Sequence, residues 1–298
     1  MTSRNPNLSR ANLRKGTVAS VLSALSYSSA ILFVRYAYQA GLNPGTALFL
    51  RFSIASIALA VFLRLSKRWT PLLAAQARSG VLLGMCTLSF MGIGWLTALK
   101  LSPAWLVSLM IAQLPLFVTI GSWLFLRHHI DRQQIVALVL VFAGTIVLFW
   151  RPFEGTGLIG ALIMIPVQLL NATYVLRAQR LTQTTSPLVI ALWTSLGAAL
   201  GTGIYALLSR QLSLSFHLVG WLWVTLFALI STVAAIVLLC QSIAWIGPSR
   251  AAIAGSAEPI FSTLIAVSVL GETMNLLQVL GGSLVLFGVL LVQRAPNQ

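Results

Sequence analysis

Glu258 is the residue of this chain best placed to do chemistry, because it is a carboxylate near the middle of an apolar run over 248–270. A charged carboxylate at the centre of a membrane helix costs about 2.5–3.5 kcal/mol on insertion scales. It must therefore face a cavity, pair with another group or hold a proton. We expect Glu258 to couple protons or to bind a substrate amine. The alternative is a structural role, in which a protonated Glu258 caps backbone groups that Pro259 leaves unpaired.

A second copy of this segment lies in the first half of the chain. There Gln113 takes the place of the carboxylate and Pro115 that of Pro259, and a further proline opens each run. Gln113 can orient a substrate or satisfy the backbone of a kinked helix, and we favour the backbone role. Because the midspan prolines remove helix hydrogen bonds, we expect paired kinks that open a cavity at the bilayer midplane. The alternative is a static bend without gating movement.

Other polar and aromatic residues inside apolar runs are candidates for lining a substrate pathway. A shift of 144 residues places Tyr27 over Asn171, so equivalent helix faces could line one path. With Gln113 and Glu258, the candidates are Tyr27, Trp95, Asn171, Tyr174, Ser231 and Thr232. The alternative for each is packing, because serine and threonine in membrane helices often bond to their own or a neighbouring helix.

Two arginines, Arg35 and Arg51, also fall within apolar runs. We expect both to extend toward the outer membrane interface, where long basic side chains place their charge. The alternative is that one of them binds a substrate carboxylate. Two Gly-x-x-x-Gly pairs, at 80–84 and 197–201, have the spacing that permits close approach between helices, within one subunit or between subunits.

Motifs for other chemistries are weak or missing. The Gly-x-Gly-x-x-Gly pattern at 155–160 connects two apolar runs rather than a strand and a helix, so we interpret it as an outer loop. His128, His129 and Asp131 share one short loop with no placed nucleophile, and we expect that loop to be solvated. The two cysteines both lie in apolar runs, which disfavours a zinc site. We therefore expect no enzyme activity, no metal and no cofactor.

The solvent for most of this chain must be lipid. Hydrophobic residues make up 58% of it and charged residues 8%, whereas soluble domains are near a quarter charged. The net charge of +15 does not indicate a nucleic-acid partner, because the cations fall in short clusters between apolar runs. The runs are long enough to cross a bilayer as helices and too uniform for barrel strands. We place ten of them at 16–37, 44–65, 79–98, 103–126, 133–150, 157–176, 187–208, 218–243, 248–270 and 275–293.

The basic clusters set the expected orientation. They alternate along the chain so that only Lys100, Arg151 and Arg210 fall on the poorer side, which predicts that both termini are cytoplasmic. We divide the chain into a cytoplasmic tail at 1–15 and two repeats of five spans, at 16–150 and 151–298. Because five is odd, the second repeat enters the membrane from the opposite side to the first. The fold predicted is an all-α membrane protein with ten transmembrane helices in two inverted repeats.

The second repeat resembles the EamA domain of the drug/metabolite transporter superfamily. The resemblance rests on the Gly-Pro-Ser-Arg to Glu-Pro-Ile-Phe segment at 247–261, on Leu-Gly-Glu at 270–272 and on the glycine-rich run at 278–288. Arg51-Phe52 also matches, while the first repeat departs from the pattern at Gln113 and at Arg127-His128. The resemblance implies a ten-helix carrier with a central cavity lined by spans one, three, four, six, eight and nine.

The function we expect is secondary transport in the cell membrane. Relatives implied by the resemblance export amino acids and related metabolites, or move nucleotide sugars, phosphorylated sugars or lipid-linked groups. We expect export of a small organic metabolite, foremost an amino acid or related compound, by alternating access. Protons would be a further partner if Glu258 couples them. The alternative is a carrier or flippase of an amphipathic or lipid-linked cargo, and the number of subunits stays open.

Overall fold

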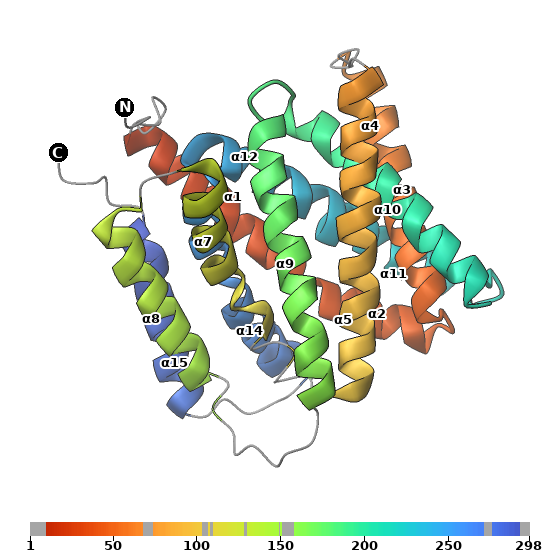
Figure 1. The fold of residues 1–298 in the computed structure, drawn as a ribbon. Coiled ribbons are helices and arrows are strands. Elements are labelled where there is room, and N and C mark those ends of the chain that lie inside the picture. Colours follow the sequence, from red (N-terminus) through yellow and green to blue (C-terminus); the bar gives the residue numbers. More distant parts are fainter. Residues whose placement is uncertain are drawn as a thin grey trace.

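The computed structural model describes residues 10–67, 74–102, 107, 110–127, 130–148, 150, 158–270 and 276–292. All regular structure within these ranges is helical (Figure 1). The expectations for His128 and His129, for the proline at 103 and for residues 155–157 of the glycine-rich connection lie outside the described residues.

The helices of the first half are α1 (Arg10–Ser28), α2 (Ala30–Gln39), α3 (Pro44–Leu65), α4 (Ala74–Leu83), the π-helical η1 (Gly84–Leu88), α5 (Ser89–Leu101), α7 (Leu114–Leu126) and α8 (Arg132–Leu148). Local sequence explains the sharp start of α3. Asn43 accepts a hydrogen bond from the backbone N–H of Thr46, and Pro44 occupies the first helical position, where a missing N–H costs nothing.

The second half repeats this order with α9 (Leu158–Leu181), α10 (Pro187–Leu208), α11 (Val219–Ala228), the π-helical η2 (Leu229–Ala234), α12 (Ala235–Ile246), α13 (Pro248–Gly255), α14 (Glu258–Leu270) and α15 (Leu276–Val292). Ser186 and Pro187 start α10 just as Asn43 and Pro44 start α3. A π-helical segment also interrupts the third long helix of each half. The duplication seen in sequence therefore extends to local backbone irregularities.

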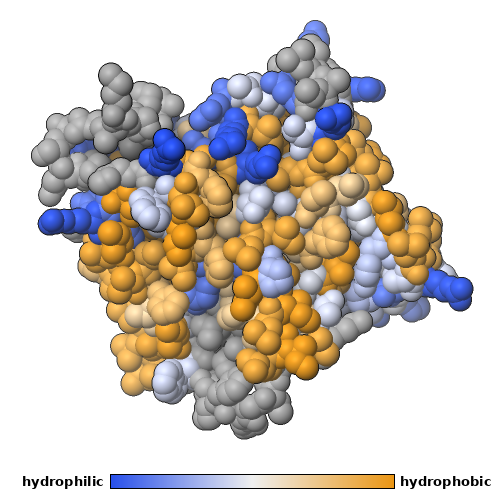
Figure 2. All heavy atoms as spheres, viewed as in Figure 1, coloured by the Kyte–Doolittle hydropathy of each residue, from blue (hydrophilic) through white to orange (hydrophobic). Residues whose placement is uncertain are grey.

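Six helical stretches are long and apolar enough to cross a membrane. They are Arg10–Gln39, Pro44–Leu65, Gln76–Ala98, Leu158–Leu181, Pro187–Leu208 and Val219–Ile246. Shorter apolar helices cover Leu114–Leu126, Arg132–Val147 and Val279–Leu291. The outer surface in Figure 2 is mostly hydrophobic below an edge where hydrophilic residues gather. The chain is thus an integral, multi-pass membrane protein.

The last helices of the two halves, α8 and α15, pack side by side and antiparallel (Figure 1). A Cβ atom added at Gly144 would lie 2.8 Å from the carbonyl oxygen of Gly281, and one added at Gly288 would lie 2.9 Å from that of Ala137. The two contacts are equivalent under the repeat, because a shift of 144 residues turns Gly144 into Gly288 and Ala137 into Gly281. Residue numbers increase along α8 in the direction in which they decrease along α15, so the two equivalent helices are antiparallel.

The second helices, α3 and α10, have the same relation. Thr46 near the start of α3 donates a hydrogen bond to the carbonyl oxygen of Gln211, just past the end of α10, at 2.6 Å. Further along α3, Phe49 lies beside Gly203, where an added Cβ would be 3.1 Å from its ring. The two helices are therefore antiparallel as well.

The first helix of each half packs into the other half. Helix α1 contacts η2, α12, α13 and α14, whereas α9 contacts η1, α5 and α7. The largest buried core includes Leu13 of α1, Val118 of α7, Tyr174 of α9 and Ile243 of α12, so it draws on both halves. The two halves therefore share one hydrophobic core.

Both Gly-x-x-x-Gly pairs meet at one helix crossing within the chain. A Cβ at Gly84 would collide with the carbonyl oxygen of Thr194 in α10, and one at Gly197 would collide with that of Val81 in α4. The small residues thus let the two backbones touch. Of the two options that the sequence left open, the structure supports contact within one subunit.

Candidate functional site

The helix with the midspan proline is interrupted just before that proline in each half. Helix α14 begins at Glu258, directly before Pro259, and α7 begins at Leu114, directly before Pro115. Proline is tolerated in the first helical turn, where its missing N–H has no partner to lose. Glu258 thus lies at the positive end of the α14 dipole, which favours a carboxylate. Gln113 is the residue before α7, without a side-chain capping bond.

At the break before Pro115, a side chain from the second half hydrogen-bonds to backbone carbonyls of the first half. The buried amide of Gln168 in α9 donates hydrogen bonds to the carbonyl oxygens of Met110 at 2.9 Å and Ile111 at 2.6 Å. Ile111 lies four residues before Pro115, so its carbonyl has no helical N–H to accept from. Gln168 therefore satisfies the carbonyl that Pro115 leaves without a helical partner, and the backbone role expected of Gln113 stays a prediction.

Three ionisable groups from three helices meet at the second break. Hydrogen bonds join the segments that carry Tyr27 of α1, Arg51 of α3 and Glu258 of α14. The Ser29 hydroxyl, two residues after Tyr27, lies 2.8 Å from that of Ser231, whose carbonyl accepts from Arg51 at 3.1 Å. Each of the three ionisable side chains keeps part of its surface accessible. The backbone carbonyl of Glu258 accepts a hydrogen bond from Ser28 at 2.9 Å. Among the described residues, no direct hydrogen bond or ion pair joins the Glu258 carboxylate to another side chain.

Arg51 points into the protein rather than toward the membrane interface. Its Nε donates to Oγ1 of Thr232 at 2.6 Å and its Nη2 to the carbonyl oxygen of Ser231 at 3.1 Å. Its guanidinium carbon lies 4.3 Å from the ring centroid of Phe227, a cation–π contact. The expectation that Arg51 snorkels outward is therefore wrong, because buried acceptors on η2 and α11 hold it. Arg35, in contrast, is exposed as expected of an outward-facing arginine.

Ser231 and Thr232 lie in the π-helical η2 and are fully buried. The Thr232 hydroxyl donates to the carbonyl oxygen of Phe227 at 3.2 Å while it accepts from Arg51. The Ser231 hydroxyl lies 2.8 Å from that of Ser29, between α1 and α2. A π-helical turn shifts backbone carbonyls out of helical register, which leaves the Ser231 carbonyl available to Arg51. The two residues therefore position Arg51 and do not themselves reach an accessible surface.

The remaining candidates are Tyr174, Trp95 and Asn171. Tyr174 is only 1% exposed, with its hydroxyl 3.9 Å from the sulfur of Cys240, so it fills the core in this conformation. Trp95 is half-buried and packs against the cluster of Ala98, Val107, Met164 and Val167. Asn171 is half-buried, and its side chain makes no hydrogen bond within the described part of the chain.

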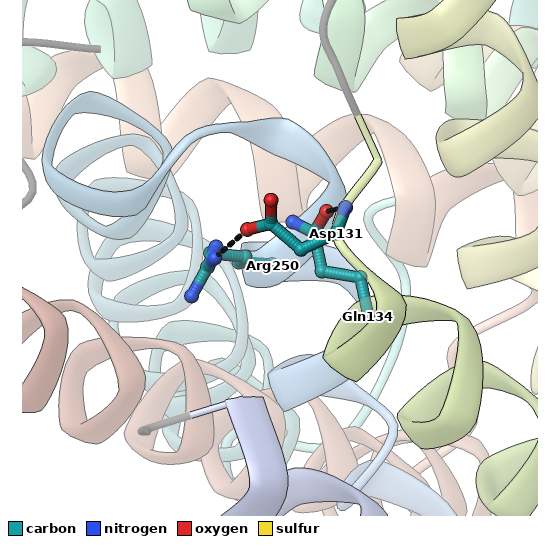
Figure 3. A network of polar contacts seen from close by, with 3 residues as sticks. All are labelled: Asp131, Gln134 and Arg250. Atoms are coloured by element: carbon teal, nitrogen blue, oxygen red, sulfur yellow. Dashed lines mark hydrogen bonds and ion pairs between the residues drawn. The ribbon is translucent and has the colours of Figure 1, made fainter. Parts of the chain in front are cut away.

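One ion pair connects the two halves at the end of the molecule where α8 begins (Figure 3). Arg250 of α13 donates to the Asp131 carboxylate at 2.5 Å, with Arg250 3% and Asp131 29% exposed. Gln134 accepts from the backbone N–H of Asp131 at 3.0 Å, a capping-box contact that fixes the start of α8. Asp131 is therefore a structured partner of Arg250 and does not lie in a merely solvated loop.

Sequence reasoning undervalued Arg51 and Arg250, and it missed the pairing of Asp131. A signal for Arg51 was present, because an ionisable residue inside a membrane helix is a functional candidate by default. No spacing rule indicated its partners, since Thr232 lies far away in the chain.

Comparisons with known proteins agree with this architecture. The EamA-like transporter family matches residues 14–150 and 158–294, one copy for each half. A protein of Archaeoglobus fulgidus described as an uncharacterized transporter is 26% identical over 284 residues, covering 95% of this chain and 97% of its own length. One crystal structure shares the fold with a TM-score of 0.78 at 17% identity, over 93% of this chain and 96% of the other. The chain therefore belongs to the EamA-like transporter family.

Proposed function

We propose that this protein is a secondary carrier of the cell membrane that exports a small organic metabolite, an amino acid or a related compound, by alternating access. The observation that carries the proposal is the meeting of Tyr27, Arg51 and Glu258 inside an apolar molecule. These groups come from both halves, hydrogen bonds join the segments that carry them, and their side chains stay partly accessible. Ionisable groups within a membrane protein usually mark a substrate or ion pathway, because burying them is costly.

Two inverted five-helix repeats would supply the movement. The antiparallel packing of α8 with α15 and of α3 with α10 supports inversion, because these helices occupy equivalent places in the two halves. The shorter helices α7, α8, α14 and α15 then complete a set of ten spans, with proline breaks in the fourth and ninth. Inverted repeats give two states of similar energy, one open to each side of the membrane.

Contacts near the start of α8 support a closed inner face. The Arg250–Asp131 pair joins the two halves there, and the hydroxyls of Thr119 and Ser249 lie 2.8 Å apart between α7 and α13. The start of α1 and the end of α15 lie at the same end of the molecule (Figure 1). With the basic bias of the connecting loops, this supports cytoplasmic termini, and on that orientation the ion pair would lie at the cytoplasmic face.

Transport by purified protein in liposomes tests the proposal. Radiolabelled amino acids and other metabolites are offered with and without a pH gradient, and we expect saturable flux of at least one of them. Flux that never saturates would indicate a channel. Movement of lipid-linked cargo alone would favour a flippase.

Glu258 is the residue we propose for proton coupling. Its carboxylate has no hydrogen-bonding partner among the described side chains and lies close to Arg51, so a proton on it changes the charge balance of the site. Glu258→Gln keeps the shape and fixes the neutral form, and we expect it to flatten the dependence of flux on pH. A variant that transports at the wild-type rate across the whole pH series would rule out coupling through this residue.

A further inference from the structure

We propose that the junction of α7, α9 and α13 is a second polar site on the transport route, where Ser122 and Gln179 bind the cargo by hydrogen bonds when the inner face opens. The site takes an uncharged group that carries N–H or O–H, and water when no cargo is present. This inference rests on the carrier function proposed above and adds a site between the inner face and the α14 break.

The junction is closed in this conformation. Helices α7, α9 and α13 contact one another. The hydroxyls of Thr119 in α7 and Ser249 in α13 lie 2.8 Å apart, and both residues are buried. Toward α9, a Cβ added at Gly121 would lie 2.6 Å from Cδ1 of Leu176. No cargo can pass between these helices until they separate.

Two buried polar atoms at the junction have no hydrogen-bonding partner in the described part of the chain. They are Oγ of Ser122, one helical turn after Thr119, and Oε1 of Gln179, one turn after Leu176. Ser122 is 0% and Gln179 7% exposed. Because residues one turn apart share a helix face, both atoms lie on the faces that form the junction.

The cost of these two atoms points to a function. Burying a polar group without a partner destabilises a protein, and native structures rarely keep such groups. An alanine or a leucine would fill similar space without this cost. A partner that arrives when the helices separate accounts for both groups, because Oε1 of Gln179 accepts from N–H or O–H and the Ser122 hydroxyl donates or accepts.

Helix α13 connects the junction to the α14 break. Ser249 lies at the beginning of α13, and Glu258 opens the helix that follows. The eight residues of α13 span about 12 Å along the helix axis. The Arg250–Asp131 pair lies beside Ser249 and ties α13 to the start of α8 (Figure 3). An exported cargo therefore passes the junction, once this tie is released, before it reaches the break.

Thiol labelling tests whether the junction opens. Ser122→Cys is made in a Cys86→Ser background, because Cys86 is exposed whereas Cys240 is buried. A charged, membrane-impermeant methanethiosulfonate is added to the cytoplasmic side of membrane vesicles. We expect slow labelling of Ser122→Cys, and labelling about 5-fold or more faster when Asp131→Asn is added, because that substitution weakens the tie between α13 and α8.

Ser242→Cys is the matched control. Ser242 is as buried as Ser122, and its hydroxyl is likewise unpaired among the residues that the structure describes. It lies one turn before Ile246, which packs against Gly16 of α1, so it stays covered when α7, α9 and α13 separate. If Ser122→Cys stays as unreactive as Ser242→Cys in both backgrounds, the inference is overturned. Equal acceleration of both by Asp131→Asn would show general loosening and would overturn it as well.

Gln179→Leu tests whether the unpaired oxygen serves binding. The substitution removes that oxygen at similar volume, so the variant should be at least as stable as the wild type. The KM for the labelled amino acid with the highest flux in the liposome assay should nevertheless rise about 2- to 10-fold, because one hydrogen bond to the cargo is lost. Gln183→Leu, at an exposed glutamine just after α9, should keep the wild-type KM.

An unchanged KM in Gln179→Leu would overturn the binding role, whether stability rises or falls. Should that variant fail to fold, Ser122→Ala provides the same comparison of KM. Saturable transport together with an unreactive Ser122→Cys would leave the carrier function intact and overturn the junction site alone. No saturable flux of any compound would overturn the carrier function, and with it the transport role of the junction.

Discussion

Asp131→Asn tests the ion pair that joins the two halves. The substitution keeps the shape of the side chain and removes its charge, so the 3%-exposed guanidinium of Arg250 loses this counter-ion. Removing one partner of a fully buried pair costs about 3–5 kcal/mol, whereas an exposed pair is worth about 0–1 kcal/mol. Because Asp131 is 29% exposed and water can screen the vacancy, we place the loss between these limits, at about 1–3 kcal/mol.

The free energy of unfolding is measured on detergent-solubilised protein by tryptophan fluorescence in denaturant. The neighbouring exposed residue provides the control, because Arg132→Gln should change stability by less than about 0.5 kcal/mol. A double-mutant cycle with Arg250→Gln should give a coupling energy of about 0.5–3 kcal/mol. If Asp131→Asn behaves like the control and the coupling energy is zero, the pair contributes nothing and our reading of Figure 3 is wrong.

Three further substitutions test the close crossing of η1 and α10, the hydrogen bonds at the break before α7, and the hydrogen bond that positions Arg51. Gly84→Ala forces a Cβ against a backbone carbonyl and should cost about 1–3 kcal/mol in unfolding free energy, while Gly255→Ala, whose Cβ would meet its nearest atom at 3.6 Å, should be near neutral; equal effects would contradict the close crossing. Gln168→Leu removes the donor to the Ile111 carbonyl, while the Met110 carbonyl keeps the N–H of Gln113, and it should cost about 1–3 kcal/mol by the same assay; an unchanged stability would refute its backbone role. Thr232→Val frees the Nε of Arg51 and should raise the KM for the transported amino acid more than it lowers stability; an unchanged KM would show that this bond does not position Arg51.

The sequence predicted the helical elements well because their signals are local. The apolar runs identify the helices, and Pro115 and Pro259 identify the two helices that are broken, without knowledge of the tertiary structure. The antiparallel relation of the equivalent helices α3 and α10, and of α8 and α15, agrees with the predicted odd number of spans in each repeat. Elements set by length, hydropathy and proline could therefore be read from the chain alone.

The site was harder to predict because its contacts cross between the halves. Helix α1 packs on α12 to α14, so the partners of its serines lie more than half the chain away. Which polar side chain faces a pathway and which fills the core depends on that packing. Tyr174 and Arg51 illustrate the difficulty, since the tyrosine proposed for the pathway is in the core and the arginine assigned to the interface lies inside.

Exchange across the membrane is the most direct test of the central claim, that two inverted halves alternate around one shared site. Liposomes that contain the protein are preloaded with an unlabelled transported amino acid, and labelled amino acid is added outside. A carrier predicts transient accumulation of label above its equilibrium level, which disappears when the internal amino acid is omitted. Label that only equilibrates, at a rate indifferent to the internal amino acid, would contradict alternating access.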